Sequence, residues 1–297
     1  MEYIALSNGI SIPKVGFGTY PLKGNVLREA LNEASVNGYG LVDTAVGYGN
    51  NADIGDLEKA DNSVLKDALI STKIDALTLR RFIFSGPLRR FAGYKQLSFL
   101  ITPNIIDKAI RQSFSDLHRI DIMLLHAPYN GCLKVYDAIS NLYLQNRIKA
   151  YGVSNFDVNE LKLLYRERGE YPMINQTEIS PYNSQKQLVE FCCEHNIVVE
   201  AYSPFGRGQL VGEFMQNPVL KEVASHYNKS VGQIILRWIV QQGMVAIVRS
   251  QNPQRIKENV EIFDFALSDT DMLAVDHLNK DLVLGANQIG KKSMQKL

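Results

Sequence analysis

Short apolar runs rich in β-branched residues alternate with longer amphipathic segments along most of the chain. Nearly continuous apolar character over so few residues is typical of strands buried on both faces, as in a parallel sheet. Eight such strands are predicted, at Lys14–Gly18, Gly40–Thr44, Ala68–Lys73, Asp121–His126, Ile148–Val153, Met173–Glu178, Val198–Ser203 and Val245–Val248.

The segments between the strands carry apolar residues at helical spacing, with one apolar face per segment. Six predicted helices lie at Val26–Asn37, Ile105–Leu117, Leu133–Gln145, Val158–Arg166, Gln185–Glu194 and Ser230–Gln242. Strand–helix repeats without a linker or low-complexity break predict an α/β fold, a single (β/α)8 TIM barrel spanning residues 1–297 as one domain. A doubly wound open sheet is the alternative. However, no GxGxxG motif follows the first strand, which counts against a Rossmann fold.

A hairpin is predicted ahead of the first barrel strand. Tyr3–Leu6 and Ile10–Ile12 are short apolar runs, and Ser7, Asn8 and Gly9 lie between them. An Asn-Gly centre between two such runs is a strong hairpin signal. We expect this hairpin to plug the N-terminal end of the barrel.

Composition narrows the possible partners. The 297 residues include 32 Lys and Arg against 31 Asp and Glu, so the net charge is +1 and no overall field favours nucleic acid or an anionic membrane. No apolar run approaches the roughly 18 residues of a spanning helix. The expected protein is a cytoplasmic monomer that acts on a small molecule.

The three cysteines, Cys132, Cys192 and Cys193, suggest neither disulfides nor a metal site. They form no disulfide framework and lack the spacing of metal ligands, which suits a reducing cytosol. We therefore expect them to be ordinary core residues, and we expect no metal.

Polar residues stand at the ends of successive strands. Asp43, Lys73 and His126 end the second, third and fourth strands, and Tyr48 lies in the turn after Asp43. Each alone has an ordinary explanation: a helix cap, a solvated strand end or a buried histidine. In a TIM barrel, however, the carboxyl ends of the strands form the active-site face, so all four would meet there. Together they indicate proton-transfer chemistry.

The chain resembles the aldo-keto reductase family in segments that run from the first strand almost to the C-terminus. The matching pieces are Gly38-Tyr39, Asp43-Thr44-Ala45, Tyr48-Gly49-Asn50, Ser71-Thr72-Lys73, Leu125-His126, Gly152-Val153-Ser154-Asn155-Phe156, Asn175-Gln176, Ala201-Tyr202-Ser203-Pro204, Arg249-Ser250, Arg255 and Glu258-Asn259. The resemblance implies an NADPH-dependent oxidoreductase that reduces an aldehyde or ketone to an alcohol, with Asp43, Tyr48, Lys73 and His126 as its catalytic tetrad.

Carbonyl reduction explains why an acid and a phenol stand together here. Hydride transfer leaves an alkoxide, which needs a nearby proton donor, and Tyr48 is the candidate. We expect the Lys73 ammonium to lower the pKa of Tyr48 toward working pH, with Asp43 keeping that lysine charged. His126 would orient the carbonyl. Gly47 and Gly49 would let the backbone turn the phenol back over the strand ends.

The resemblance also implies a cofactor site across the barrel mouth. Ser154, Asn155 and Gln176 would hold the nicotinamide amide, although Ser154-Asn155 are also explained by a helix cap. Arg249, Ser250 and Arg255 would bind the 2′-phosphate, which favours NADPH over NADH. The full set of expected cofactor contacts is Gly18, Thr19, Tyr20, Asp43, Ser154, Asn155, Gln176, Tyr202, Ser203, Arg249, Ser250, Arg255, Glu258 and Asn259.

The expected substrate pocket departs from the family pattern. Many relatives have an aromatic residue after the third-strand lysine and a Trp after the catalytic histidine, whereas this chain has Ile74-Asp75 and Ala127. The expected substrate contacts are Tyr20, Tyr48, Ile74, His126, Ala127 and Tyr129.

The chain is also longer than the family pattern after the third strand, with an inserted loop at about 76–103. Its segment 77–100 contains Arg80, Arg81, Arg89, Arg90 and Lys95 and no acidic residue. One interpretation is a solvated or partner-docking surface; the other is a lid that favours anionic or polar substrates.

Two other functional classes stay open. One is an NADPH-binding regulatory or partner-docking homologue with low turnover, against which the complete tetrad argues. The other is an aldolase- or isomerase-type barrel, which would have no need of the motif formed by Arg249, Ser250, Arg255, Glu258 and Asn259.

Overall fold

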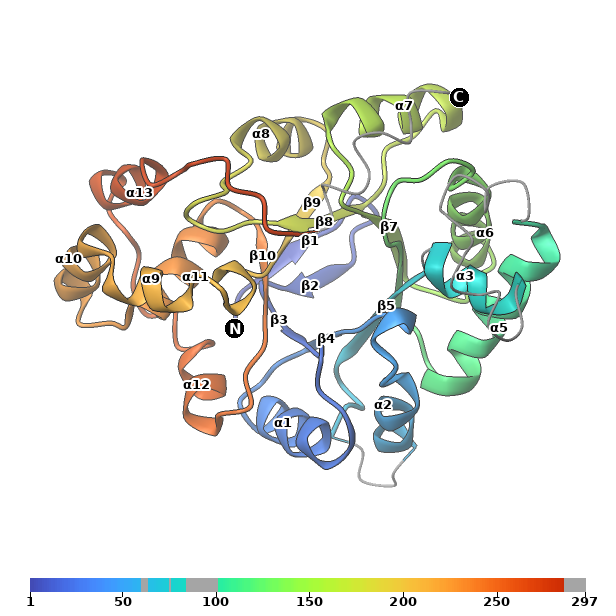
Figure 1. Ribbon diagram of the computed structural model, residues 1–297, viewed down its shortest axis with the longest axis horizontal. Coiled ribbons are helices and arrows are strands. Elements are labelled where there is room, and N and C mark those ends of the chain that lie inside the picture. The colour runs from blue at the N-terminus through green and yellow to red at the C-terminus, as the bar shows by residue number, and fades with distance from the viewer. Residues whose placement is uncertain (60–63, 75, 84–100, 286–297) are drawn as a thin grey trace.

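Eight parallel strands close into a barrel that is surrounded by helices (Figure 1). The computed structural model describes residues 1–59, 64–74, 76–83 and 101–285. The last barrel strand pairs in parallel with the first, at Val248 and Phe17, which confirms the TIM barrel and excludes the open sheet. The barrel strands are β3 (Val15–Gly18), β4 (Leu41–Asp43), β5 (Leu69–Ile74), β6 (Ile122–Leu125), β7 (Ala150–Ser154), β8 (Ile174–Glu178), β9 (Val198–Tyr202) and β10 (Val245–Val248).

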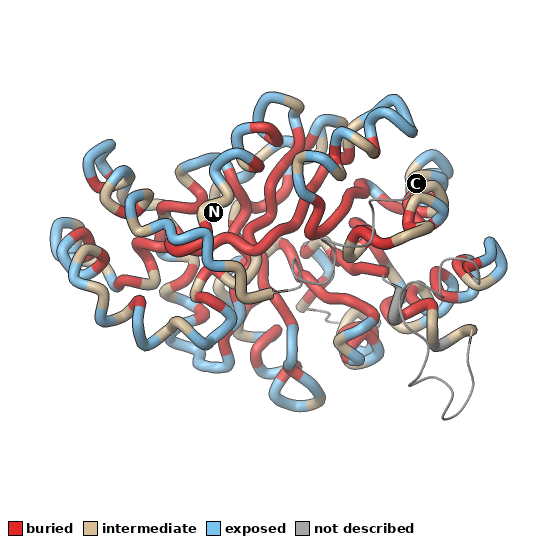
Figure 2. Tube along the Cα trace, turned by 45° about the horizontal axis from the view of Figure 1, so that its top comes forward, coloured by how far each residue is buried: buried red, intermediate tan, exposed pale blue. Residues whose placement is uncertain are grey.

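The barrel strands are buried on both faces. Apart from Leu69 and Tyr202, every one of their residues is buried, and the buried trace fills the centre of the molecule in Figure 2. One face of each strand points into the barrel and the other packs against helices. This double burial explains the nearly continuous apolar runs in the sequence.

The helices surround the barrel and cover the outward faces of the strands. All six helices predicted from the sequence are present, with ends within two residues of the expected ones. Further helices that the periodicity did not single out are α2, α3, α9, α10, α12 and α13. The described helices are α1 (Gly24–Val36), α2 (Asn51–Glu58), α3 (Ala76–Ile83), α5 (Pro103–Leu117), α6 (Leu133–Leu144), α7 (Val158–Arg168), α8 (Lys186–Glu194), α9 (Val211–Gln216), α10 (Pro218–Tyr227), α11 (Val231–Gln241), α12 (Pro253–Glu258) and α13 (Asp269–Asp276), with 3-10 turns η1 (Val46–Tyr48) and η3 (Gly206–Gly208).

The predicted N-terminal hairpin is confirmed. Strands β1 (Tyr3–Ala5) and β2 (Ser11–Pro13) pair antiparallel, with Ile12 fully buried. The Asn8 amide donates to the carbonyl oxygen of Lys149 over 3.0 Å, directly before β7 begins. The hairpin therefore lies at the amino ends of the barrel strands, opposite the end where chemistry is expected.

The insertion after β5 begins as a helix rather than as a loop. Helix α3 packs against α5 and against η1, the turn that contains Tyr48. Leu79 of this helix is fully buried in the core. The remainder of the predicted insertion up to residue 100, with Arg89, Arg90 and Lys95, lies outside the described residues.

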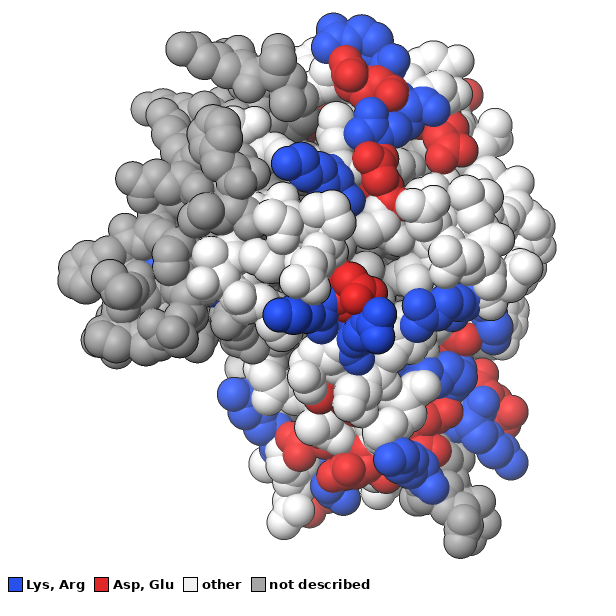
Figure 3. Space-filling view, turned by 90° about the vertical axis from the view of Figure 1, so that its right-hand side faces the viewer, with Lys and Arg blue, Asp and Glu red and all other residues white. Residues whose placement is uncertain are grey.

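Charge on the surface is mixed where it can be seen. On the side that carries α5 and α6, Lys and Arg side chains are interleaved with Asp and Glu (Figure 3). No helix in the described ranges is both long and apolar enough to cross a bilayer.

Strand packing in the barrel leads to one stability prediction. Gly152 of β7 lies so close to the Ile174 carbonyl oxygen of β8 that an added Cβ would overlap it. Backbone on both sides cannot easily move, so we expect Gly152→Ala to lower the free energy of unfolding by about 1–3 kcal/mol, the usual cost of overpacking. Urea unfolding measures this change.

The matched control is Gly212→Ala in α9, where the new methyl group meets nothing within 4 Å. There we expect unchanged or slightly higher stability, because alanine favours helix. Equal effects at the two positions would contradict the packing argument.

Candidate active site

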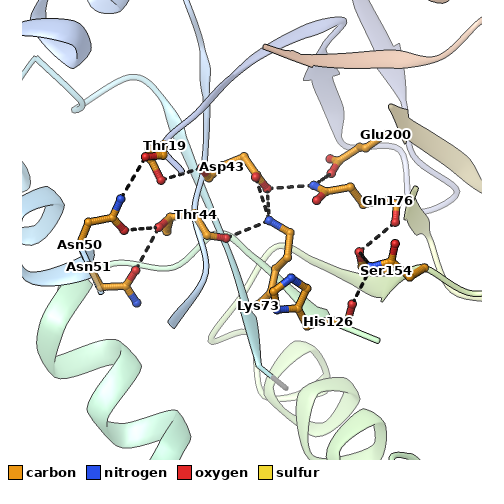
Figure 4. A network of polar contacts seen from close by, with 11 residues as sticks. Thr19, Asp43, Thr44, Asn50, Asn51, Lys73, His126, Ser154, Gln176 and Glu200 are labelled. Atoms are coloured by element: carbon orange, nitrogen blue, oxygen red, sulfur yellow. Dashed lines mark hydrogen bonds and ion pairs between the residues drawn. The ribbon is translucent and has the colours of Figure 1, made fainter. Parts of the chain in front are cut away.

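A buried ion pair lies at the centre of the barrel mouth. Lys73 of β5 places Nζ 2.6 and 2.8 Å from the two carboxylate oxygens of Asp43, which ends β4 (Figure 4). The same ammonium donates to the Thr44 carbonyl oxygen over 2.9 Å. The Lys73 side chain is fully buried and that of Asp43 is 5% exposed. The lysine is therefore held charged and in one position by three acceptors.

The phenol and the imidazole lie above this pair. The Tyr48 ring centroid is 5.5 Å from Lys73 Nζ and 6.2 Å from the His126 ring, which it meets edge to face. The backbone of His126 is fixed by two hydrogen bonds, one donated to Ile74 and one accepted from the Asn155 side chain. The structure thus brings together all four residues of the expected tetrad.

The pKa of Tyr48 differs from the sequence-based expectation. Burial raises the pKa of Tyr48; Lys73 acts in the opposite direction, as expected, but burial and the Asp43 carboxylate outweigh it. The expectation that the pKa of Tyr48 falls is therefore wrong for this structure. For Lys73, burial lowers the pKa, yet Asp43 and further anionic neighbours raise it more, so the amine stays protonated.

A clamp around Asn50 holds the turn that carries Tyr48. The Asn50 amide nitrogen donates to the carbonyl oxygens of Thr19 and Leu22, and its oxygen accepts from the Thr44 hydroxyl over 2.9 Å. Gly49 ends the turn at φ 69°, a left-handed conformation that favours glycine. This short segment therefore ties the end of β4 to the loop after β3 and fixes the phenol between them.

A second acid, Glu200, extends the network across the barrel. Ser154, Gln176 and Glu200 stand in register on β7, β8 and β9, so all three face the barrel interior. Gln176 Nε2 donates to Asp43 Oδ1 over 2.9 Å and to Glu200 Oε2 over 2.7 Å (Figure 4). Sequence reasoning missed Glu200. The sequence feature that could have revealed Glu200 is a single acidic residue inside the apolar strand Val198–Tyr202.

A cavity of about 1020 Å³ opens beside the tetrad. It lies at the upper end of the range for small-molecule pockets, roughly 300–1,000 Å³. The expected site residues that line it are Gly18, Thr19, Tyr20, Asp43, Tyr48, His126, Ser154, Asn155, Gln176, Tyr202, Ser203 and Arg249. Among the described residues, no group of three or more His, Cys, Asp or Glu could hold a metal ion.

Other expected contacts lie outside the cavity lining. Three proposed substrate residues, Ile74, Ala127 and Tyr129, do not line it, and Ile74 and Tyr129 are buried. Ile74 follows the inward-facing Lys73 directly, so its side chain points to the opposite face of the strand. Lys73, Ser250, Arg255, Glu258 and Asn259 do not line the cavity either.

Polar side chains form one wall of the cavity. Asn155 donates to Ser154 Oγ and accepts a 2.8 Å hydrogen bond from the Tyr202 hydroxyl. Ser154 Oγ donates to the Gln176 carbonyl oxygen. Helix α7 is capped by Asp157, with a capping box to Glu160, so Ser154 and Asn155 are not its cap. They serve the cavity wall instead.

Two cations follow strand β10, and one of them lines the cavity. Arg249 follows β10 and lines the cavity, and Arg255 lies on α12, where its backbone amide donates to the capping Asn252 side chain. Both guanidinium groups are exposed, and within the described part of the chain neither has a hydrogen bond or an acidic partner. The buried Ser250 accepts a hydrogen bond from the Asn252 amide. This end of the site suits an anionic group.

The C-terminal segment reaches the rim beside the ends of β8 and β9. The Leu284 amide donates to Glu178 Oε1 over 2.9 Å, and a Cβ added at Gly285 would overlap Glu178, Arg207 and Tyr202. Sequence reasoning missed Arg207, which lies on η3 and lines the cavity, and Thr78 of α3; Arg80 of α3, which the sequence placed only in a basic insertion, also lines the cavity.

Comparison with known proteins agrees with this geometry. The Aldo/keto reductase family model matches residues 14–280. Glyoxal reductase of Bacillus subtilis (strain 168) is 35% identical over 96% of both chains, and the uncharacterized oxidoreductase YtbE of the same organism is 37% identical over 94% of both. The crystal structure of MGS-M4, an aldo-keto reductase enzyme from a Medee basin deep-sea metagenome library, superposes with a TM-score of 0.81 at 28% identity and covers 96% of this chain and 97% of its own.

The buried acid gives a testable pH dependence. Burial raises the pKa of Glu200 from 4.5 to about 7, and the Asp43 carboxylate adds to this rise. Because the folded pKa exceeds the unfolded one, the stability that protonated Glu200 contributes is complete below about 4.5 and is lost as pH rises through about 7. We expect Glu200→Gln, which cannot ionise, to be more stable than wild type at about pH 8, by on the order of 2–3 kcal/mol.

Urea unfolding followed by the fluorescence of the single, buried Trp238 measures this difference. The gain should become small at about pH 4.5, where Glu200 is protonated in the folded state and already half protonated in the unfolded state. Glu222→Gln, an exposed change on α10, is the control. A stability difference that does not vary with pH would contradict the argument.

Proposed function

Since the chain belongs to the aldo/keto reductase family, we propose that it uses NADPH to reduce an aldehyde or ketone to an alcohol, with Tyr48 as the proton donor. The observation that carries this proposal is the convergence of Asp43, Tyr48, Lys73 and His126 beside one cavity. Assembly of the complete tetrad supports catalysis over a purely regulatory role.

The residues that line the cavity and follow β10 suit nicotinamide adenine dinucleotide phosphate. Amide and hydroxyl groups of Ser154, Asn155 and Gln176 stand near the tetrad, where they would hold the carboxamide, and Tyr202 would stack on the ring. Arg249 and Arg255, which have no acidic partner among the described residues, would hold the 2′-phosphate. The cofactor, when bound, supplies the hydride that is added to the carbonyl carbon.

Tyr48 supplies the proton. Its raised pKa keeps the phenol protonated near neutral pH, so a proton is available when negative charge develops on the carbonyl oxygen. As the O–H bond breaks, the Lys73 ammonium stabilises the phenolate that forms, and the proton becomes the hydroxyl hydrogen of the alcohol. Lys73 therefore acts mainly after proton transfer, when it stabilises the Tyr48 phenolate.

His126 and Asp43 prepare this step. The imidazole shares the cavity wall with the phenol, where it orients the carbonyl oxygen toward Tyr48 Oη. Asp43 keeps the ammonium charged despite complete burial. The role of His126 follows from its place in the cavity wall, and the role of Asp43 follows from its contact with Lys73.

The setting of the enzyme is also a proposal. Cys132 and Cys192 are buried as expected, whereas Cys193 is exposed and the expectation of a core residue is wrong for it. All three are free thiols, in keeping with a reducing compartment. We place the protein in the cytoplasm as a monomer that acts on a small carbonyl compound.

Removing the proton donor tests the mechanism. We expect Tyr48→Phe to lower turnover at least about 100-fold, because the alkoxide loses its acid, while the Kd for NADPH changes less than about threefold. Steady-state oxidation of NADPH and titration of its fluorescence measure the two quantities.

Tyr165→Phe on α7 is the matched control, since its half-exposed ring stacks on Tyr171 away from the cavity. If Tyr48→Phe kept more than about a tenth of wild-type turnover, another group would be the acid.

The cofactor preference has its own test. We expect wild type to bind NADPH at least about tenfold more tightly than NADH, because only NADPH carries the ribose 2′-phosphate that Arg249 and Arg255 would pair with. Arg255→Ala should weaken NADPH binding much more than NADH binding.

Lys257→Ala removes a cation from the same helix, but one that lies 3.7 Å from Glu261 and is therefore already paired. This control should leave the ratio of the two dissociation constants unchanged. Equal dissociation constants of wild type for NADPH and NADH would contradict the assignment of the 2′-phosphate site.

A further inference from the structure

Arg80 of α3 lines the active-site cavity, although it belongs to the insertion that departs from the family pattern. Its helix is docked: Leu79 is fully buried, Thr78 is 1% exposed and also lines the cavity, and α3 packs against the turn that carries Tyr48. The backbone of Arg80 is therefore held on the tetrad side of the barrel mouth.

One edge of this guanidinium is shielded from water and unused. Within the part of the chain that the structure describes, Arg80 Nε and Nη2 are buried and have no hydrogen-bond partner. A buried charged donor without an acceptor is costly. Nε and Nη2 lie on the same side of the planar group and form a two-pronged fork, whose natural partner is the pair of oxygens of a carboxylate.

Among the residues that the structure describes, none supplies an anion for this fork. The insertion contains no acid between residues 77 and 100. The one acid that lines the cavity, Asp43, is already engaged by Lys73 and Gln176. An anion that neutralises Arg80 must then come from a bound molecule.

The cofactor is a poor candidate for that anion. In the closed ring of strands, β5, which precedes α3, lies directly opposite β9 and is separated from β10 by β3 and β4. The cavity cations Arg207 and Arg249 follow β9 and β10, and Arg249 is the one proposed to hold a cofactor phosphate. Arg80 stands on the other side of Tyr48 and His126, where a substrate would extend away from its carbonyl group.

We propose that Arg80 binds the carboxylate of the substrate, and that the enzyme therefore selects aldehydes or ketones bearing a carboxylate. Binding would turn the Nε–Nη2 edge of Arg80, which is buried in the structure, toward the cavity that this side chain already lines, while the carbonyl end meets Tyr48 and His126. This inference rests on the proposed carbonyl reduction and adds a substrate class to it.

The test compares carboxybenzaldehydes with carbamoylbenzaldehydes, para and meta, which differ in charge but hardly in size. In wild type, kcat/KM should be at least about tenfold higher for the better carboxylate than for its amide. Arg80→Gln should lower kcat/KM for the carboxylate by about 10- to 100-fold, mainly through KM, and change the amide less than about threefold. Arg80→Lys should recover only part of the loss, because it restores charge without the fork.

Arg166→Gln, an exposed cation on α7, controls for loss of overall charge and should change neither substrate. NADPH titration of Arg80→Gln should give the wild-type Kd, which shows a folded site. Equal loss of both substrates in Arg80→Gln, or no preference in wild type, would overturn the carboxylate proposal while carbonyl reduction stands. Failure of wild type to reduce any of the aldehydes would count against the proposed function itself.

Discussion

The buried contact between Lys73 and Asp43 is the constraint on which the rest of the site depends. An ammonium without solvent exposure is costly unless several acceptors surround it, and here Asp43 and the Thr44 carbonyl group do so. Gln176 donates hydrogen bonds both to Asp43 and to Glu200, so it links the ion pair to the opposite side of the barrel. The position of the reactive phenol is thus set by a network that spans several strands, and any loss of one charge would leave its partner buried and uncompensated.

Closure of the barrel makes this network possible. Residues more than a hundred positions apart in sequence, such as Asp43 and Gln176, become neighbours because the strands form a ring and their inward side chains stack in layers. The same geometry separates functions around the rim. Cations after β9 and β10 face one side of the tetrad, and Arg80 after β5 faces the other.

The sequence carries much of this architecture, and its limits have physical causes. Asp43, Lys73 and His126 could be placed together because carboxyl ends of parallel strands share one face, a rule that needs no side-chain detail. Glu200 escaped notice because its inward direction depends on strand register with Gln176, which an apolar run does not reveal. The direction of the pKa shift of Tyr48 could be predicted only from the burial of the phenol. The position of Arg80 in the cavity wall could be predicted only from the packing of α3 against the barrel. Both are products of tertiary packing and not of local pattern.

The contact of Gly285 with Glu178, Arg207 and Tyr202 has a practical consequence for anyone who handles the protein. The chain leaves the described region directly beside the cavity rim, whereas the hairpin at residues 3–13 lies at the opposite end of the barrel. A substitution at Gly285 would therefore act on the catalytic side, beside the loop that carries Arg207. A change in the hairpin would act at the opposite end of the barrel, away from the cavity.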